Sequence, residues 1–172
     1  MAPNLLVRPA APGDLAAVAD IYAHYVTGTV ATFEEHPPPI ADWRRRLDDL
    51  TERGLPFLVG EAGGEVAGYA YAGPWRPKPA YRHTVEDSIY LAPGRTGAGF
   101  GTLLLGALLE ACAGTDARQV IAVVADTGSD ASTALHRRAG FTDAGRLTAV
   151  GYKHGRWIDT LLLQYTVPAR DQ

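Results

Sequence analysis

Cysteine is almost missing from this chain of 172 residues, which contains Cys112 and no other. One thiol cannot form an internal disulfide, so nothing in the sequence requires an oxidising compartment. Cys112 follows Leu105, Leu108 and Leu109 at helical spacing, a pattern typical of a core residue rather than a nucleophile. The five histidines show no metal-ligand spacing with one another or with Cys112, and we therefore expect no metal site.

Long apolar runs and an excess of positive charge are also lacking. No stretch approaches the roughly 20 apolar residues of a membrane span, and the N-terminus lacks the basic and apolar segments of a signal peptide. The formal net charge is −3, and the arginines at 44–46 lie among aspartates. We therefore expect a soluble, cytoplasmic protein that binds neither membranes nor nucleic acids.

The chain does contain enough apolar material for a real core, with 47% hydrophobic and 20% charged residues. We expect one domain over residues 1–172, with a core of about residues 5–167. Apolar periodicity, together with glycine and proline at the breaks, predicts a series of strands and helices. In order they are a strand at 5–8, helices at 15–25 and 43–50, strands at 56–62 and 65–71, a strand ending before Pro93, a helix after Gly101, a strand at 119–125, a helix at 129–139, and strands at 141–150 and 157–167. This order predicts a mixed α/β sheet, with a rigid exposed loop at 73–79.

Glycines at 97, 99 and 101 mark the junction between a strand and a leucine-rich helix. Closely spaced glycines and a helix N-terminus favour binding of a phosphate, although glycines also serve plain tight turns. A P-loop is excluded because Gly101 is followed by Thr102 and Leu103 instead of Lys and Ser or Thr. A dinucleotide-binding fingerprint is disfavoured because the spacing is G-x-G-x-G and the unit lies mid-chain.

Glu86 lies on the strand before this junction. Alternation places Thr84, Ser88 and Tyr90 on its face, and a polar set on a central strand is hard to explain by packing. A surface-facing strand that carries a charge is the alternative. Glu86 is the candidate base, and Asp87, on the opposite face, is interpreted as structural.

Five ordered segments resemble a known family: YAYAGPW (69–75), AYRHTVEDSIY (80–90), the glycine loop, LHRRAGF (135–141) and GYKHGRWIDT (151–160). On these segments, which span nearly the whole chain, it resembles the GNAT acetyltransferases, and more narrowly the phosphinothricin and methionine sulfoximine N-acetyltransferase branch. The resemblance implies a central, mostly antiparallel twisted sheet with helices on both faces. It also implies acetyl-coenzyme A as co-substrate, an amino-acid-like acceptor and a homodimer.

The resemblance also implies roles for individual residues. Glu86 is the expected general base, the main-chain N–H groups of Tyr90 and Leu91 the oxyanion donors, and His136 the proton donor to the leaving thiolate, although His136 could equally be an ordinary helix histidine. The expected cofactor-binding residues are Ile89, Tyr90, Leu91, Arg95, Thr96, Gly97, Ala98, Gly99, Phe100, Gly101, Thr102, Ser129 and Ser132. The expected acceptor-binding residues are Phe33, Arg76, Lys78, Tyr81 and Glu86.

Some of these positions depart from the family pattern or have ordinary alternatives. Thr96 occupies the usual Gln or Arg position of the pyrophosphate loop, with Arg95 one residue early, and Ser129 stands where relatives often carry asparagine. The basic loop could be merely solvated, and Phe33 could be a core residue. The function expected from the sequence is acetyl transfer to the α-amine of phosphinothricin, methionine sulfoximine or a sulfone analogue, without a covalent enzyme intermediate. Acetylation of another amine and a non-catalytic coenzyme A sensor remain open as alternatives.

Overall fold

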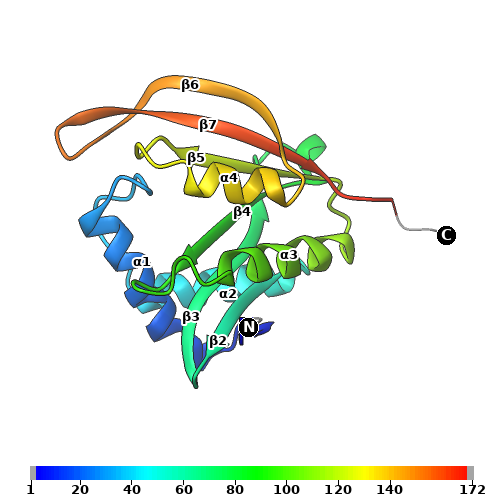
Figure 1. The fold of residues 1–172 in the computed structure, drawn as a ribbon. Helices are drawn as coiled ribbons and strands as arrows, with labels where there is room; N and C mark the ends of the chain where they lie inside the picture. The colour runs from blue at the N-terminus through cyan, green and yellow to red at the C-terminus, as the bar shows by residue number, and fades with distance from the viewer. Residues whose placement is uncertain (1–2, 170–172) are drawn as a thin grey trace.

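The computed structural model describes residues 3–169. Its strands are β1 (Leu6–Pro9), β2 (Phe57–Ala62), β3 (Glu65–Pro74), β4 (Thr84–Leu91), β5 (Gln119–Ala125), β6 (Thr142–Lys153) and β7 (Arg156–Thr166). Its α-helices are α1 (Leu15–Gly28), α2 (Ile40–Glu52), α3 (Phe100–Ala113) and α4 (Ala131–Arg138). The strands form one sheet in the order β1-β2-β3-β4-β5-β7-β6 (Figure 1). The expected mixed, mostly antiparallel sheet is therefore confirmed.

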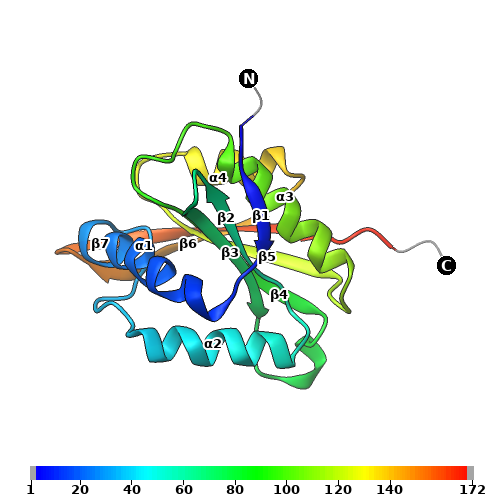
Figure 2. The same ribbon diagram turned by 90° about the horizontal axis from the view of Figure 1, so that it is seen from below.

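Helices cover both faces of the sheet. Figure 2 shows α1 and α2 on one side of β2, β3 and β4, and α3 and α4 on the other. Side chains alternate accordingly, since Val59 and Tyr69 pack with the residues of α1 and α2, whereas Leu58 and Ala70 pack with the leucines of α3. Burial on both faces explains why these strands are largely apolar. The predicted core residue Cys112 is fully buried on the α3 side.

The neighbouring strands β4 and β5 form the one parallel pair within residues 3–169. Their register extends only from Thr84 opposite Gln119 to Glu86 opposite Ile121, although β4 continues to Leu91 and β5 to Ala125. Beyond Glu86 the two strands separate. Main-chain groups in the middle of the sheet are thereby left available to a ligand.

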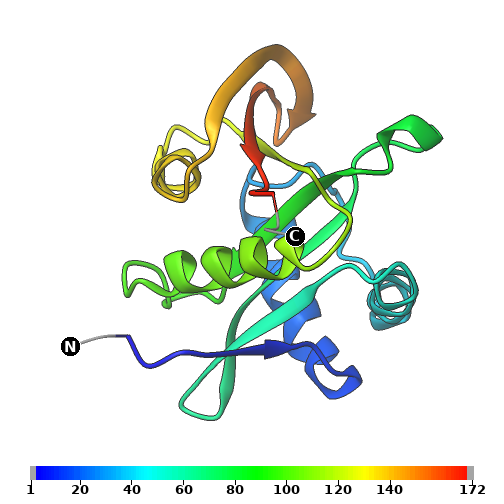
Figure 3. The same ribbon diagram turned by 90° about the vertical axis from the view of Figure 1, so that its right-hand side faces the viewer.

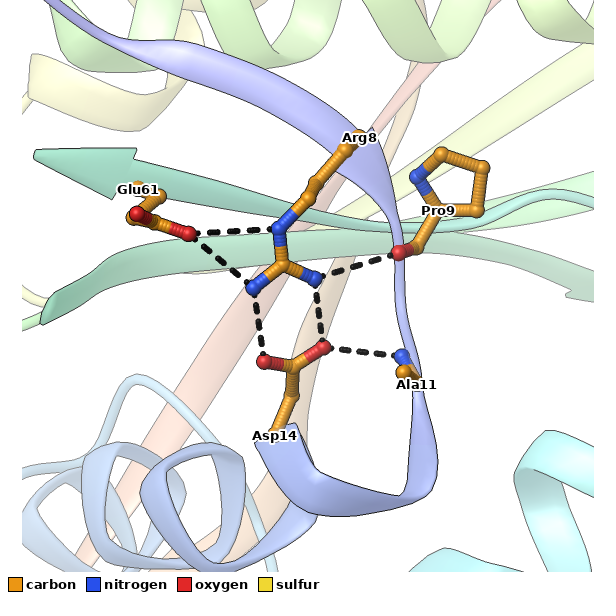
Figure 4. Close-up of polar contacts among 5 residues, drawn as sticks. All are labelled: Arg8, Pro9, Ala11, Asp14 and Glu61. Carbon is orange, nitrogen blue, oxygen red and sulfur yellow. Dashed lines mark hydrogen bonds and ion pairs between the residues drawn. The ribbon is translucent and has the colours of Figure 1, made fainter. Parts of the chain in front are cut away.

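Arg8 ties the first strand to the start of α1 (Figure 4). Its guanidinium donates to both carboxylate oxygens of Asp14, at 2.8 and 2.9 Å, and to Glu61 on β2, at 3.1 and 3.2 Å. Asp14 also accepts the Ala11 N–H, at 2.8 Å. The hydrogen bonds from Arg8 hold the pKa of Asp14 below its usual range. This forked pairing fixes the direction in which the chain leaves the sheet and enters the helix.

Several predicted boundaries were wrong by one to three residues; for example, the helix predicted at 129–139 spans Ala131–Arg138. The exposed loop expected from Gly73 begins later, because Gly73 and Pro74 extend β3 opposite Glu86 and Val85. The N–H that proline lacks would point toward the β2 side, where β2 begins only opposite Tyr71. The strand expected to end at residue 150 runs to Lys153, past a register shift between Leu147 and Gly151. No helix within residues 3–169 has both the length and the apolar character needed to cross a membrane.

Candidate active site

A cavity of about 910 Å³ opens where β4 and β5 separate. Tyr22 and Tyr25 of α1 line it from one face of the sheet, and Ser132 and His136 of α4 line it from the other. Residues of both separated strands complete the lining. The cavity therefore passes through the plane of the sheet, a place where a long ligand can reach both faces.

Glu86 lies in this cavity, on the face of the sheet that α1 and α2 cover. The register sets Ser88 opposite Tyr71 and Tyr90 opposite Tyr69, which confirms the predicted shared face of Glu86, Ser88 and Tyr90. Glu86 is only partly exposed. Burial and, to a smaller extent, the neighbouring charge of Asp87 raise the pKa of its carboxyl group. A carboxylate with a raised pKa inside a cavity suits proton abstraction.

The glycine segment forms another wall of the cavity. Gly97 and Gly99 both have positive φ, 78° and 81°, so side chains there would be strained. The first turn of α3, which begins at Phe100, directs main-chain N–H groups without helical acceptors toward this segment. The side chain of Phe100 itself is buried against Ala62 and Ala67. The geometry is that of an anion site made by main-chain groups.

Asp87 and His136 form a buried pair in the wall of the cavity. His136 Nε2 lies 2.7 Å from Asp87 Oδ2, and His136 Nδ1 lies 2.7 Å from the carbonyl oxygen of Ser132. Because the carbonyl can only accept, Nδ1 carries a hydrogen, and a second proton is shared between Nε2 and the carboxylate. Burial alone lowers the pKa of His136, but the hydrogen bond and charge of Asp87 outweigh it and raise that pKa. Asp87 Oδ1 is buried without a hydrogen-bond partner.

Main-chain groups of β4 face the gap between the separated strands. The Ala92 N–H bonds to the carbonyl oxygen of Ala67 on β3. Alternation along an antiparallel ladder then turns the Tyr90 N–H toward β3, and those of Ile89 and Leu91 toward the gap. Of the two expected oxyanion donors, Leu91 is thus the one that faces the cavity. The Tyr90 ring packs against Tyr22, 5.3 Å between centroids.

The cavity gathers most of the residues that the sequence singled out. Its lining includes Phe33, Glu86, Ile89, Tyr90, Leu91, Thr96, Gly97, Gly99, Gly101, Thr102, Ser129, Ser132 and His136. Six other predicted site residues are not part of the lining: Arg76, Lys78, Tyr81, Arg95, Ala98 and Phe100.

The basic loop between β3 and β4 lies apart from the cavity. In Figure 3 it projects beyond the sheet on the side away from α3 and α4. The Arg76 guanidinium lies 5.0 Å from the ring centroid of Trp75, and Tyr81 is 42% exposed. Arg95, in the glycine segment, forms an exposed ion pair with Glu65 at 3.4 Å. The acceptor and cofactor roles of these side chains stay predictions.

Several residues of the cavity lining were not predicted from the sequence. Tyr22 and Tyr25 fit the apolar periodicity of the helix predicted at 15–25, which gives no sign that they line a cavity. Tyr25 donates its hydroxyl hydrogen to the Leu91 carbonyl oxygen at 2.5 Å. Arg138 is the one arginine or lysine among the described lining residues. Helical spacing within LHRRAGF gave no signal to single it out. Within residues 3–169, no cluster of His, Cys, Asp or Glu could hold a metal ion.

Comparisons with known proteins agree with this geometry. Residues 18–141 match the model of the Acetyltransferase (GNAT) family. The chain is 48% identical over 165 residues to a phosphinothricin N-acetyltransferase of Alcaligenes faecalis, covering 96% of this chain and 84% of that one. It is 38% identical to an L-methionine sulfoximine/L-methionine sulfone acetyltransferase of Pseudomonas aeruginosa, covering 92% of each.

A solved structure extends the likeness to three dimensions. The crystal structure of a GNAT superfamily phosphinothricin acetyltransferase from Sinorhizobium meliloti in complex with AcCoA superposes with a TM-score of 0.91. The two sequences are 42% identical, and the match covers 97% of this chain and 89% of the other. The fold and family expected from the sequence are therefore confirmed. The chain belongs to the GNAT family of acetyltransferases.

Proposed function

We propose that this chain transfers the acetyl group of acetyl-coenzyme A to the α-amine of a small amino-acid analogue of the phosphinothricin, methionine sulfoximine or methionine sulfone type. The observation that carries the proposal is one cavity in which Glu86 and the glycine-rich anion site are both exposed. Relatives with these activities at 48% and 38% identity support the acceptor class.

Acetyl-coenzyme A fits the donor side of the cavity. Its pyrophosphate would lie at Thr96–Thr102, held by main-chain N–H groups and the N-terminus of α3. This mode of binding does not require the absent Gln or Arg side chain at position 96. The pantetheine arm would run in the gap between β4 and β5, along Ile89 and Leu91 and beside Ser129 and Ser132. The cofactor supplies an activated thioester carbonyl.

Glu86 would act as the general base on the acceptor side. An α-amine is mostly protonated near neutral pH and must lose a proton before it can attack. Burial raises the pKa of Glu86, and the neighbouring charge of Asp87 adds to the effect, which makes the carboxylate a better proton acceptor. Phe33 would form the apolar wall beside the acceptor.

The N–H groups of Leu91 and Ile89 would stabilise the negative charge that develops on the thioester oxygen. The pair of Asp87 and His136 would supply the proton to the departing thiolate, and one of the two hydrogen bonds of the His136 ring would break for the transfer. Transfer without a covalent enzyme intermediate is consistent with Cys112 being a poor nucleophile. Burial raises the pKa of its thiol to about 12, and the residue lies outside the cavity lining. Arg76, Lys78 and Tyr81 lie outside the cavity lining, so they would contact the acceptor only if the loop between β3 and β4 moves toward the cavity.

The test is thiol release from acetyl-coenzyme A with phosphinothricin, methionine sulfoximine, methionine sulfone, common amino acids, a polyamine and an N-terminal peptide. Saturable turnover with the first three is expected. Turnover confined to the polyamine or peptide would replace the acceptor assignment. Tight coenzyme A binding with no acetylation of any amine would instead indicate a sensor.

We also propose that the chain forms a homodimer in the cytoplasm, through the hairpin of β6 and β7. This hairpin exposes large apolar side chains: Leu147 at 46%, Val150 at 52%, Tyr152 at 57% and Trp157 at 69%. Such a group of exposed apolar side chains is typical of a protein interface. Light scattering after gel filtration should give twice the monomer mass of 18.3 kDa. Trp157→Ser should shift that mass toward the monomer.

A further inference from the structure

The loop between α1 and α2 carries one wall of the proposed acceptor site. Ala31, Thr32 and Phe33 line the cavity, and residues 29–39 belong to no helix or strand. An irregular loop keeps one position only when contacts from outside compensate the entropy of ordering it. Two such contacts come from the end of β6, at the tip of the hairpin that lies beside this loop (Figures 1 and 2).

Lys153 makes the first contact. Its Nζ donates a hydrogen bond of 2.7 Å to the carbonyl oxygen of Thr32, and the residue is only 5% exposed. Burial lowers the pKa of Lys153, while the charges of Glu34 and Glu35 favour its ammonium form. Burying a cation against a carbonyl stabilises a fold less than burying an apolar side chain of the same size. The lysine is therefore better explained by the position that it imposes on Thr32.

Thr32 is also held from the opposite side. Its hydroxyl lies 2.6 Å from the hydroxyl of Tyr22 on α1, which itself lines the cavity. The Glu34 N–H donates to the same threonine oxygen at 3.4 Å. Thr32 thus joins α1 to β6, and Phe33 follows directly after this fixed residue.

Gly151 makes the second contact. A Cβ at this position would lie 2.4 Å from Cζ and 2.5 Å from Cε2 of Phe33, so the ring lies directly against the bare main chain of β6. Gly151 has no positive φ, and glycine is required there for space rather than for conformation. Alternation puts Gly151 and Lys153 on the same buried side of β6, with Tyr152 exposed on the other.

We propose that Gly151 and Lys153 are positioning residues for the acceptor: they lie outside the cavity lining and fix its acceptor wall by holding Thr32 and seating the Phe33 ring. The inference rests on the proposed acetyl transfer, and it adds two residues of the closing hairpin to the determinants of acceptor specificity. The donor side, formed by the glycine segment and α4, makes no use of them.

Lys153→Met and Gly151→Ala test the proposal by different means, since the first removes a hydrogen bond and the second fills the space under the ring. Each should raise KM for the acceptor about tenfold and leave KM for acetyl-coenzyme A within about twofold. In a Phe33→Ala background neither change should raise the acceptor KM further, because both act through that ring. The proposal would be overturned by an unchanged KM for the acceptor or by equal increases in the KM values for acceptor and acetyl-coenzyme A. It would also be overturned if the effects of either change and of Phe33→Ala on the acceptor KM were fully additive.

Val167→Ala serves as the control for general loss of stability. Val167 is 3% exposed in the core beneath α3 and lies outside the cavity lining. This variant should lower Tm while both KM values stay within about twofold.

Hydrogen exchange gives a readout that needs no turnover. Lys153→Met should speed amide exchange in the segment 31–35 and leave the segment 97–102 unchanged. Unchanged exchange in 31–35 would contradict the role of Lys153 even in a variant too unstable for kinetics. If the wild type acetylates none of the amines while Lys153→Met still loosens 31–35, the proposed function fails and the positioning contact stands.

Discussion

The buried pair of Asp87 and His136 gives the sharpest energetic prediction. Asp87→Ala removes the hydrogen-bond partner of His136 Nε2, with both side chains almost fully buried, 1% and 3% exposed. Removing one member of such a pair typically destabilises a protein by 3–5 kcal/mol. The imidazole can relieve part of this loss by releasing its proton, so we expect about 3 kcal/mol. For a chain of 172 residues this lowers Tm by about 8 °C.

The loss should depend on pH. The folded-state pKa of His136 is raised above the ordinary value of 6.5. The stability that this shift contributes is fully present below pH 6.5 and is lost as the pH rises through the folded-state pKa. The difference in unfolding free energy between wild type and Asp87→Ala should therefore be larger at pH 6 than at pH 9.

Urea denaturation at pH 6 and pH 9, followed by circular dichroism, measures both values. Asp143→Ala is the matched control, because Asp143 pairs with Arg137 at 2.9 Å on the surface and its loss should leave the midpoint nearly unchanged. A loss below about 1 kcal/mol at pH 6, or the same loss at both pH values, would refute the assignment of a shared proton to the pair.

Four further predictions concern three single substitutions. Glu86→Gln should lower kcat by about 10²–10⁴-fold and abolish the rise of kcat with pH through the raised pKa of Glu86, and an unchanged pH–rate profile would count against its role as base. The same variant should have a higher Tm than wild type at pH 7. The raised pKa means that the fold favours the neutral carboxyl group of Glu86; this contribution to stability is fully present below pH 4.5 and is lost as the pH rises through the folded-state pKa, whereas the glutamine stays neutral. Asp14→Asn should lower Tm more at pH 6 than at pH 3, since the contribution of Asp14 is fully present above pH 3.8 and is lost as the pH falls through its depressed pKa. Cys112→Ala should keep kcat within about twofold, as expected for transfer without a covalent enzyme intermediate, and a large loss of kcat in a folded protein would argue against direct transfer.

Local patterns were sufficient for the order of the elements and for many residues of the cavity lining. Period-two alternation placed Glu86, Ser88 and Tyr90 on one face because the strand register preserves that alternation without a bulge. Glycine spacing predicted the bend before α3 because Gly97 and Gly99 adopt φ values that disfavour other residues. In both cases the cause of the structure lies within a few residues of the signal.

Contacts between distant segments could not be predicted in this way. Asp87 and His136 are 49 residues apart, and Lys153 and Thr32 are 121 apart. Each of these side chains has an ordinary local interpretation as a strand acid, a helix histidine or a turn lysine. Only the packing of α4 against the sheet, and of the hairpin against the loop after α1, gives them partners. The point at which β4 and β5 separate likewise has no local signal, because it involves two strands and the helices α1 and α4 on either face of the sheet.

Because β4 and β5 separate, side chains from both faces of β4 line one cavity. Within a closed sheet, Glu86 and Asp87 would face different layers and could not serve one ligand. Here the cavity reaches both layers, so in the proposed mechanism an acceptor on the α1 side would meet Glu86, and a thiolate leaving toward α4 would meet the proton held by Asp87 and His136. In that mechanism, proton removal and proton donation would take place on opposite sides of one strand. The carboxylate that must take up a proton and the imidazole that must give one up then do not neutralise each other by direct contact.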